Sequence, residues 1–156
     1  MKKLASLIMT ILIAIMPMNL SFANEGNAQI SISSKSAILM DVASGQILYE
    51  KNAHDKLPPA SVTKVMTMLL ICEALDSGKI TLDDNVQISE NAASMGGSQI
   101  FLEPGEVQKV DTLLKGIAVA SANDGCVAMA EYIGGSVESF VEMMNAKAKA
   151  LNMKDT

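Results

Sequence analysis

The chain has 156 residues, of which 49% are apolar and 19% are charged, and its net charge is −5. This length suits one domain, and the composition argues against an intrinsically disordered chain. All 12 basic residues are lysines, so the chain has neither the basic surface nor the arginines that nucleic-acid binding requires.

The first 23 residues have the order of a Sec-type signal peptide. A basic start, Met1-Lys2-Lys3, precedes an almost uniformly apolar run over residues 4–16, and Ser21-Phe22-Ala23 offers small residues at a cleavage site. An uncleaved anchor helix is the alternative, but the run is shorter than the roughly 20 residues that span a bilayer, and Pro17 follows it. We expect cleavage after Ala23, which leaves 133 residues with a net charge of −7, and export from the cytoplasm.

A hairpin is predicted behind a loose polar leader over residues 24–35. Two apolar strand candidates, residues 37–41 and 46–50, flank a segment that ends on the turn residue Gly45. After residue 50 almost nothing has the pattern of a strand, and a two-stranded hairpin alone is only marginally stable. We therefore expect an incomplete sheet in a domain that continues beyond Thr156.

Residues 60–77 have the strongest helical pattern in the chain. Pro59 precedes them, Gly78 follows them, and Ser61 or Thr63 is a candidate N-cap. Because this segment is apolar nearly all round, we predict a central helix that is buried on most of its faces. Three further helices are predicted at residues 111–120 with Asp111 as the cap, 126–133 ended by Gly134-Gly135, and 136–151, with a single helical turn over 89–94 and a turn over 121–125.

Ser61-Val62-Thr63-Lys64 places a serine and a lysine in the first turn of the predicted buried helix. Residues three apart lie about 60° apart around a helix, so the Lys64 amine can approach the Ser61 hydroxyl. Burial would lower the pKa of Lys64 and make it a base, and the helix N-terminus offers N–H groups to a developing oxyanion. The pattern predicts an activated nucleophile. The alternative is a capping serine with a lysine that reaches water, which is commoner for an isolated S-x-x-K.

Ser121-Ala122-Asn123 is the second candidate element of the site. A hydroxyl there could relay a proton, and the Asn123 amide could orient the lysine and bind a substrate carbonyl. An ordinary interhelical turn is the alternative. Ser89-Glu90-Asn91 has the same S-x-N pattern, but we prefer the later one because apolar helices flank it.

Other chemistries have weaker support. His54, the only histidine, is the sole possible base of a Ser-His-Asp triad, but Lys64 already provides a base one helical turn from Ser61, and we expect His54 at the surface. No Cys/His cluster suggests a metal site, and no cofactor is predicted. Cys72 and Cys126 lie in apolar helical segments where cysteine usually packs as a small core residue, so a disulfide between them is not favoured.

Together the two motifs resemble those of the penicillin-binding protein and serine β-lactamase superfamily. The resemblance is closest to the D-alanyl-D-alanine carboxypeptidases of low molecular mass and covers about residues 35–156. The segments that carry it are Leu57-Pro58-Pro59-Ala60-Ser61-Val62-Thr63-Lys64, Gly97-Ser98-Gln99-Ile100-Phe101-Leu102, Ala120-Ser121-Ala122-Asn123-Asp124 and Phe140-Val141-Glu142-Met143-Met144-Asn145. It implies an α/β (α+β) fold of the β-lactamase/transpeptidase type, of which residues 36–156 would be the helix-rich N-terminal part, with an incomplete antiparallel sheet.

The resemblance implies a serine peptidase that removes the terminal D-alanine from peptidoglycan stem peptides ending in D-Ala-D-Ala. Ser61 would form the acyl-enzyme, Lys64 would take its proton, Ser121 would pass a proton to the leaving amine, and Asn123 would hold Lys64 and the substrate. β-Lactam antibiotics would be trapped at Ser61. The protein would act in the cell envelope, on the outer side of the cytoplasmic membrane or secreted, with peripheral membrane association through a C-terminal tail.

Two departures from the family pattern bear on activity. Ala122 replaces the glycine of the usual S-G-N, and the third motif, K-T-G, is absent. With no arginine in the chain, no bidentate receptor for the substrate carboxylate remains, so we expect residues 1–156 alone to have little or no activity. The rivals are a class A-like β-lactamase with the same nucleophile, and a truncated, non-catalytic envelope protein.

Overall fold

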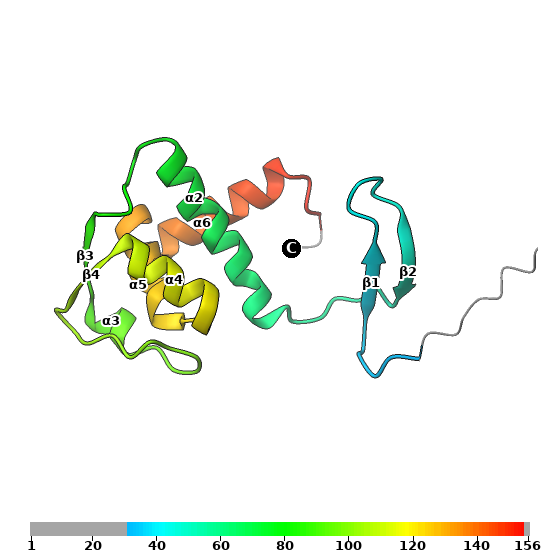
Figure 1. Ribbon diagram of the computed structural model, residues 1–156, viewed down its shortest axis with the longest axis horizontal. Coiled ribbons are helices and arrows are strands. Elements are labelled where there is room, and N and C mark those ends of the chain that lie inside the picture. Colours follow the sequence, from blue (N-terminus) through cyan, green and yellow to red (C-terminus); the bar gives the residue numbers. More distant parts are fainter. Residues whose placement is uncertain (1–30, 155–156) are drawn as a thin grey trace, which may run out of the picture. The chain divides into compact units, whose positions relative to one another are not determined.

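The structure is a computed structural model that describes residues 31–154. The predicted signal peptide, residues 1–23, and most of the predicted leader lie outside the described residues. The chain divides into two units, one that ends at Ala53 and one that begins at His54. The first contains a β-hairpin and the second contains the helices (Figure 1).

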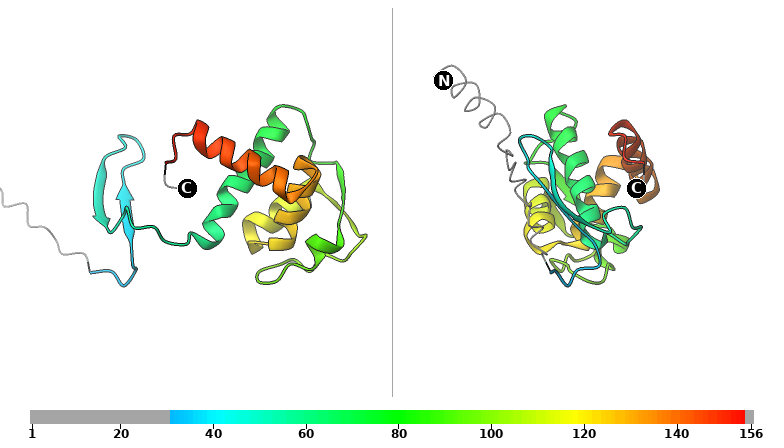
Figure 2. Two further views of the ribbon diagram at one scale, coloured as in Figure 1. Left: turned by 180° about the vertical axis from the view of Figure 1, so that it is seen from behind. Right: turned by 90° about the vertical axis from the view of Figure 1, so that its right-hand side faces the viewer.

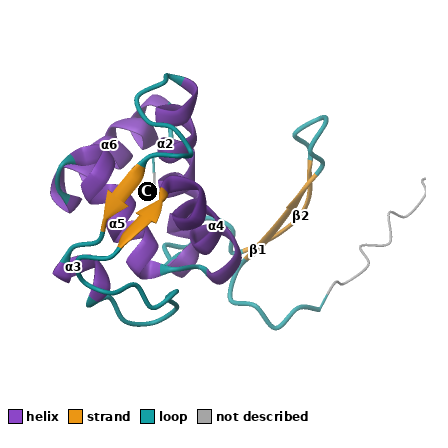
Figure 3. Cartoon of the chain, turned by 60° about the vertical axis from the view of Figure 1, so that its left-hand side comes forward, coloured by secondary structure: helices purple, strands orange, loops and turns teal. Residues whose placement is uncertain are grey.

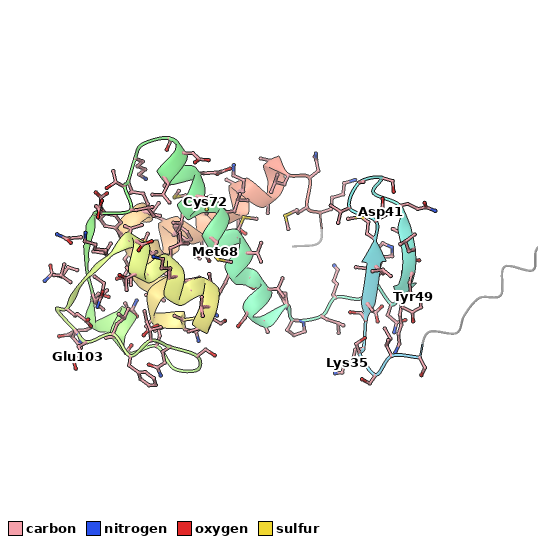
Figure 4. All side chains as sticks on the ribbon, viewed as in Figure 1. Lys35, Asp41, Tyr49, Met68, Cys72 and Glu103 are labelled. Carbon is pink, nitrogen blue, oxygen red and sulfur yellow. The ribbon has the colours of Figure 1, made fainter. Side chains whose placement is uncertain are left out.

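The hairpin consists of β1 (Ala37–Met40) and β2 (Ile47–Lys51), which pair antiparallel with a bulge between Leu39 and Met40. Asp41 organises the turn, because its Oδ1 accepts hydrogen bonds from the backbone N–H of Ser44 at 2.7 Å and from the Ser44 hydroxyl. Gly45 closes the turn at φ +71°, a conformation that glycine adopts without steric cost. The predicted hairpin is confirmed, and Figure 4 shows Asp41 at its turn.

The end of β2 holds the segment that precedes β1. Lys51 Nζ donates to the backbone oxygens of Ile32 and Ser34 at 2.9 and 2.8 Å, and the Asn52 amide donates to the backbone oxygen of Lys35 at 3.0 Å. Residues 32–35, the end of the predicted leader, are therefore hydrogen-bonded to the hairpin.

The predicted helix at residue 60 begins as a 3₁₀ turn, η1 (Ala60–Thr63), and continues as α2 (Lys64–Asp76). The prediction that Ser61 or Thr63 caps it is wrong, because no side chain accepts a hydrogen bond at either start. An N-cap residue is normally extended, whereas Thr63 is helical itself, at φ −51° and ψ −31°. Both hydroxyls therefore take no part in helix capping.

The sequence predicted that α2 is buried on most of its faces. In the structure it is buried on one face only. Its buried residues follow a helical spacing: Thr67, Leu70, Ile71 and Ala74. Val65, on another face, is 60% exposed. The pattern of apolar residues did not reveal this, because α2 carries no polar stripe that would mark its exposed side.

A second pair of antiparallel strands, β3 (Asn85–Gln87) and β4 (Val107–Lys109), was not predicted from the sequence. Each strand has three residues, and Val86 is the only one of the six that is buried, so no apolar alternation marks them. Two bonds extend the pairing, from Ile88 N–H to Glu106 O at 2.8 Å and from Gly105 N–H to Ile88 O at 2.8 Å. Figure 3 shows the two strands side by side against the helices.

The remaining helices are α3 (Glu90–Ala93), α4 (Val110–Ala120), α5 (Asn123–Gly134) and α6 (Val137–Ala150). Ser89 caps α3 and Ser136 caps α6 through their side chains. Asp111 does not cap α4, because that helix begins one residue earlier and Asp111 lies in its first turn. Helix α5 begins at Asn123, three residues before its predicted start.

Helix α5 lies at the centre of the helical unit. It packs against α2, α3, α4, α6 and β3, and the two turned views of Figure 2 show the other helices around it. Met129, Leu113, Ile71 and Phe140, from four helices, are almost completely buried in one core. Burial of such a side chain contributes about 1.5–3 kcal/mol, so this core orients α2 and α5 firmly against each other. Within residues 31–154, no helix has the length and apolarity that crossing a membrane requires.

Candidate active site

The serine and the lysine of the S-x-x-K motif are in direct contact. Lys64 Nζ donates a hydrogen bond to Ser61 Oγ at 3.2 Å. Ser61 is exposed and Lys64 is half-buried, so the predicted burial of the lysine is only partial. The pair has the geometry of a nucleophile with an adjacent base.

The residue before the serine adopts a rare conformation. Ala60 has φ +47°, in the left-handed region that non-glycine residues usually avoid. A residue held there costs of order 1–3 kcal/mol and persists only where the surrounding structure enforces it, often at functional sites. The strain at Ala60 directly precedes Ser61 in the 3₁₀ turn.

An open pocket of about 480 Å³ brings the two predicted motifs together. Ser61 and Lys64 contribute to it from η1 and α2, and Asn123 contributes from the first position of α5. The other lining residues are Ala60, Thr63, Thr67, Met95, Cys126 and Val127. The structure therefore unites three of the four predicted site residues.

Ser121, the fourth predicted residue, is not among the residues that line this pocket. It ends α4 in the left-handed conformation, at φ +56°, two residues before Asn123. Its Oγ is buried, and no hydrogen-bond partner for it exists among residues 31–154. A buried hydroxyl without a partner carries a desolvation penalty, which is one mark of a functional group.

Asn123 is held by a loop that sequence reasoning did not connect with the site. Its side-chain Nδ2 donates to Gly96 O at 2.6 Å, and its backbone N–H donates to Ser98 O at 2.7 Å. Met95 of the same loop lines the pocket. This loop, residues 95–102, thus lies against the first turn of α5.

Asp124, which the sequence marked only as part of a turn, has structural importance. It is fully buried, and its carboxylate accepts from the backbone N–H groups of Ile100 at 3.1 and 3.2 Å, Leu102 at 3.1 Å and Gly125 at 2.8 Å. An acidic residue in the first turn of a helix also interacts favourably with the helix dipole. The available signal was an aspartate beside the candidate Asn123 in an otherwise apolar region.

Three of the pocket residues that were missed follow predicted ones at helical spacing. Thr67 lies three residues after Lys64 on α2, and Cys126 and Val127 lie three and four residues after Asn123 on α5. Residues at these spacings share a helix face. Knowledge of the site residues on each helix would therefore have sufficed to find their neighbours.

The alternative S-x-N motif, Ser89-Glu90-Asn91, has a structural role. Ser89 Oγ accepts from Ala92 N–H at 2.9 Å and caps α3, while the Asn91 amide donates to Glu131 Oε1 at 2.8 Å. Neither residue lines the pocket. His54 is exposed, as predicted, and is also absent from the pocket lining.

The two cysteines are free and differ in environment. Cys72 is exposed on α2 (Figure 4), contrary to the core position predicted for it. Cys126 is half-buried on the pocket wall, and burial raises the pKa of its thiol to about 11, with a smaller opposing effect from the positive charge of Lys64. Among the residues that the structure describes, no group of three His, Cys, Asp or Glu side chains is placed to hold a metal ion.

A family model and a curated relative that match this chain have the same description. Residues 23–156 match the model of peptidase family S11, D-alanyl-D-alanine carboxypeptidase. The chain is 54% identical to D-alanyl-D-alanine carboxypeptidase DacF of Bacillus subtilis, over 100% of this chain and 41% of that protein. It therefore spans about two fifths of the length of this curated relative.

Two solved structures are similar as well. The D-alanyl-D-alanine carboxypeptidase DacD from Francisella tularensis has a TM-score of 0.79 at 40% identity, over 83% of this chain and 31% of that one. Penicillin binding protein 6B from Escherichia coli has a TM-score of 0.75 at 43% identity, over 81% of this chain and 42% of that one.

Proposed function

The chain belongs to the D-alanyl-D-alanine carboxypeptidase family, peptidase family S11, and on this premise we propose that the protein removes the terminal D-alanine from peptidoglycan stem peptides. The predicted fold class, α/β (α+β) of the β-lactamase/transpeptidase type with a helix-rich N-terminal part, is confirmed by the likeness to the two solved structures. The observation that carries the proposal is the 3.2 Å contact between Ser61 Oγ and Lys64 Nζ on the wall of a pocket.

In this proposal Ser61 is the nucleophile. Its Oγ attacks the carbonyl carbon of the penultimate D-alanine while Lys64 takes the hydroxyl proton. The Ser61 backbone N–H, at the start of the helix, is one donor to the oxyanion. The bond to the terminal D-alanine then breaks, the leaving amine receives a proton through Ser121, and water hydrolyses the acyl-enzyme with the help of Lys64.

Asn123 would hold the substrate and the lysine. Asn123 lines the same pocket as Ser61 and Lys64, and its carboxamide has both a donor and an acceptor. A peptide main chain presents the complementary groups, and the Lys64 amine can donate to the carboxamide oxygen. A β-lactam, whose amide resembles the scissile bond, would acylate Ser61 in the same way and leave slowly.

The test is covalent labelling by a fluorescent penicillin of the protein expressed from its complete coding sequence. We expect a persistent adduct at Ser61 in the wild type and none in Ser61→Ala, while Ser77→Ala is labelled as the wild type is. Ser77 is a matched control because it lies at the other end of α2, where its hydroxyl donates to Ala74 O at 3.2 Å. Labelling that survives in Ser61→Ala would refute the assignment, and rapid penicillin turnover without an adduct would favour a β-lactamase.

Lys64→Arg separates a base from a mere positive charge. The guanidinium keeps the charge but stays protonated at any relevant pH, so it cannot take the Ser61 proton. We expect acylation to slow by roughly 10²–10⁴-fold, the usual contribution of a general base. An acylation rate close to that of the wild type would exclude Lys64 as the base.

Export and domain organisation belong to the same proposal. Residues 1–23 would be a signal peptide, 24–35 a leader and 36–156 the N-terminal part of the catalytic domain, and the protein would act in the cell envelope. The mass of the protein recovered from the producing cells tests this, since the mature chain should begin at Asn24. A retained Met1 would refute cleavage, and membrane association stays a prediction.

A further inference from the structure

The loop over residues 95–102 determines which way the Asn123 carboxamide points. A backbone carbonyl oxygen can only accept a hydrogen bond, so the group that faces Gly96 O at 2.6 Å must be the nitrogen of the carboxamide. This leaves Asn123 Oδ1 and the second N–H of Nδ2 for the pocket that Asn123 lines. Rotation of the carboxamide by 180° would bring two acceptors, Asn123 Oδ1 and Gly96 O, together. It would also exchange the positions of the carboxamide donor and acceptor relative to the pocket.

The loop is anchored to α5 at two neighbouring residues. The Asn123 backbone N–H donates to Ser98 O at 2.7 Å, and the buried Asp124 carboxylate accepts from the N–H groups of Ile100 and Leu102. Because Asp124 has no exposed surface, its carboxylate has no access to water as a substitute for these donors. The loop therefore cannot leave the first turn of α5 without an unfavourable loss of buried hydrogen bonds.

Gly97 lies where the loop passes closest to the carboxamide. A Cβ atom at this position would be 2.8 Å from Asn123 Nδ2, which is closer than real Cβ contacts allow. Gly105, in the same connection between α3 and β4, has the matching backbone conformation, φ +79° against +80°, but a Cβ atom there would meet nothing within 4 Å. The pair separates the effect of contact with Asn123 from the effect of backbone strain.

We propose that Gly97 and Asp124 are positioning residues of the active site, which act on the reaction only through the orientation of the Asn123 carboxamide. The proposal rests on the proposed function, because it gives Asn123 a part in acylation. Gly97 leaves space for the carboxamide nitrogen, and Asp124 holds the loop whose Gly96 oxygen binds that nitrogen. The catalytic contact itself stays with Asn123.

The first experiment compares Gly97→Ala with Gly105→Ala in the protein expressed from its complete coding sequence. Both variants place alanine at positive φ, so both should melt a few degrees lower, while the acylation rate with labelled penicillin should fall only in Gly97→Ala. We expect a loss of roughly 10- to 100-fold, as displacement of a catalytic group by about 1 Å causes. Equal acylation rates in the two variants would overturn the proposal.

A double-mutant cycle excludes a merely structural effect. In an Asn123→Ala background the new methyl group has no carboxamide to displace, so Gly97→Ala should cause no further loss of acylation. A further loss as large as in the wild-type background would mean that Gly97 acts by another route, and would overturn the proposal. The part of Asp124 is tested by the same cycle with Asp124→Asn, whose loss of acylation should likewise vanish in the Asn123→Ala background.

An NMR measurement that does not depend on activity distinguishes failure of the proposed function from failure of the positioning proposal. In protein labelled with ¹⁵N-asparagine, the side-chain signals of Asn123 are those that vanish in Asn123→Ala. They should shift and lose protection from hydrogen exchange in Gly97→Ala and stay in place in Gly105→Ala. If wild-type protein takes no penicillin label but these shifts occur, the proposed function fails and the orientation by Gly97 stands. Unchanged signals in Gly97→Ala would overturn the positioning proposal whatever the activity.

Discussion

Ser121 carries two unfavourable features in one residue. It is a non-glycine residue at positive φ, and its hydroxyl is buried without a hydrogen-bond partner among residues 31–154. The unpaired hydroxyl alone costs about 1–3 kcal/mol. Retention of both features at the residue proposed to relay a proton suggests that Ser121 serves the reaction and not the stability of the fold.

Ser121→Ala should therefore separate stability from activity. The substitution removes the unpaired hydroxyl, so the melting temperature should stay the same or rise, while acylation by penicillin should slow by roughly 10²–10⁴-fold. Ser136→Ala is the matched control with the opposite signature. It loses the cap that accepts from Ser139 N–H at 3.1 Å, so it should be destabilised by about 1 kcal/mol and be acylated normally. A lower melting temperature with unchanged acylation in Ser121→Ala would contradict this role.

The raised pKa of Cys126 predicts a pH-dependent difference between the two thiols. Burial favours the neutral thiol, so with a pKa of about 11 only about 0.1% of Cys126 is the reactive thiolate at pH 8. Its alkylation by iodoacetamide should be slow at pH 8 and should accelerate about tenfold per pH unit towards pH 11. Exposed Cys72 should react first. Mass spectrometry of the two peptides measures both rates, and equal rates at pH 8 would contradict the prediction.

Among the elements, the connection from α5 to α6 leaves little room for a side chain. A Cβ atom on Gly134 would lie 2.9 Å from the backbone nitrogen of Phe140 and 3.0 Å from its Cβ. Gly135 then ends α5 at φ +80°. The first turn of α6 therefore packs directly against the backbone of Gly134, and Phe140 reaches the core from there.

Gly134→Ala should force α6 away from α5. Overpacking of this kind costs about 1–3 kcal/mol, so the melting temperature should fall by several degrees. Gly96→Ala is the control, because Gly96 has no positive φ and a Cβ atom there would meet nothing within 4 Å. Thermal unfolding followed by circular dichroism measures both variants. Equal melting temperatures would show that α6 can move without loss of packing.

Elements with local signals were predicted well, and elements made by tertiary contacts were not. The hairpin at residues 37–51, the helix that ends before Gly78, and the Ser136-capped helix depend on turn or capping residues within a few positions. Strands β3 and β4 pair across a separation of about 20 residues and show no alternation, so nothing local marks them. The start of α5 was placed too late, because Asn123-Asp124-Gly125 has turn chemistry although it is helical.

The candidate site divides in the same way. The contact of Ser61 with Lys64 follows from helix geometry alone, and the sequence predicted it. Asn123 was predicted as a partner of that pair from its place on a turn between two apolar helices, but its distance from the pair could not be derived, because its helix meets α2 through the folded core. The positioning contacts of Gly97 and Asp124 link residues more than 20 positions apart and had no signal in one sequence.

On the scale of the whole molecule, the two units should differ in local stability. The apolar side chains of the hairpin, such as Ile38 and Leu48, are each 58% exposed, whereas Met129 and Ile133 of α5 are buried. In the 156-residue chain, hydrogen exchange should be slowest in α5 and fast in β1 and β2, because a two-stranded hairpin is marginal without further burial. Amides in the hairpin that exchange as slowly as those of α5 would contradict this expectation.

Most residues that line the pocket come from the segment of η1 and α2 and from α5. Acylation by penicillin therefore reports whether these segments have packed together. A chain that had formed its helices without packing them would still hold Ser61 beside Lys64, since one turn contains both, but Asn123 would be elsewhere. Far-ultraviolet circular dichroism would show the full helix content in such a chain, whereas a penicillin would not acylate its Ser61. The labelled fraction of a refolding sample would then follow the last step of its assembly, the docking of α2 on α5.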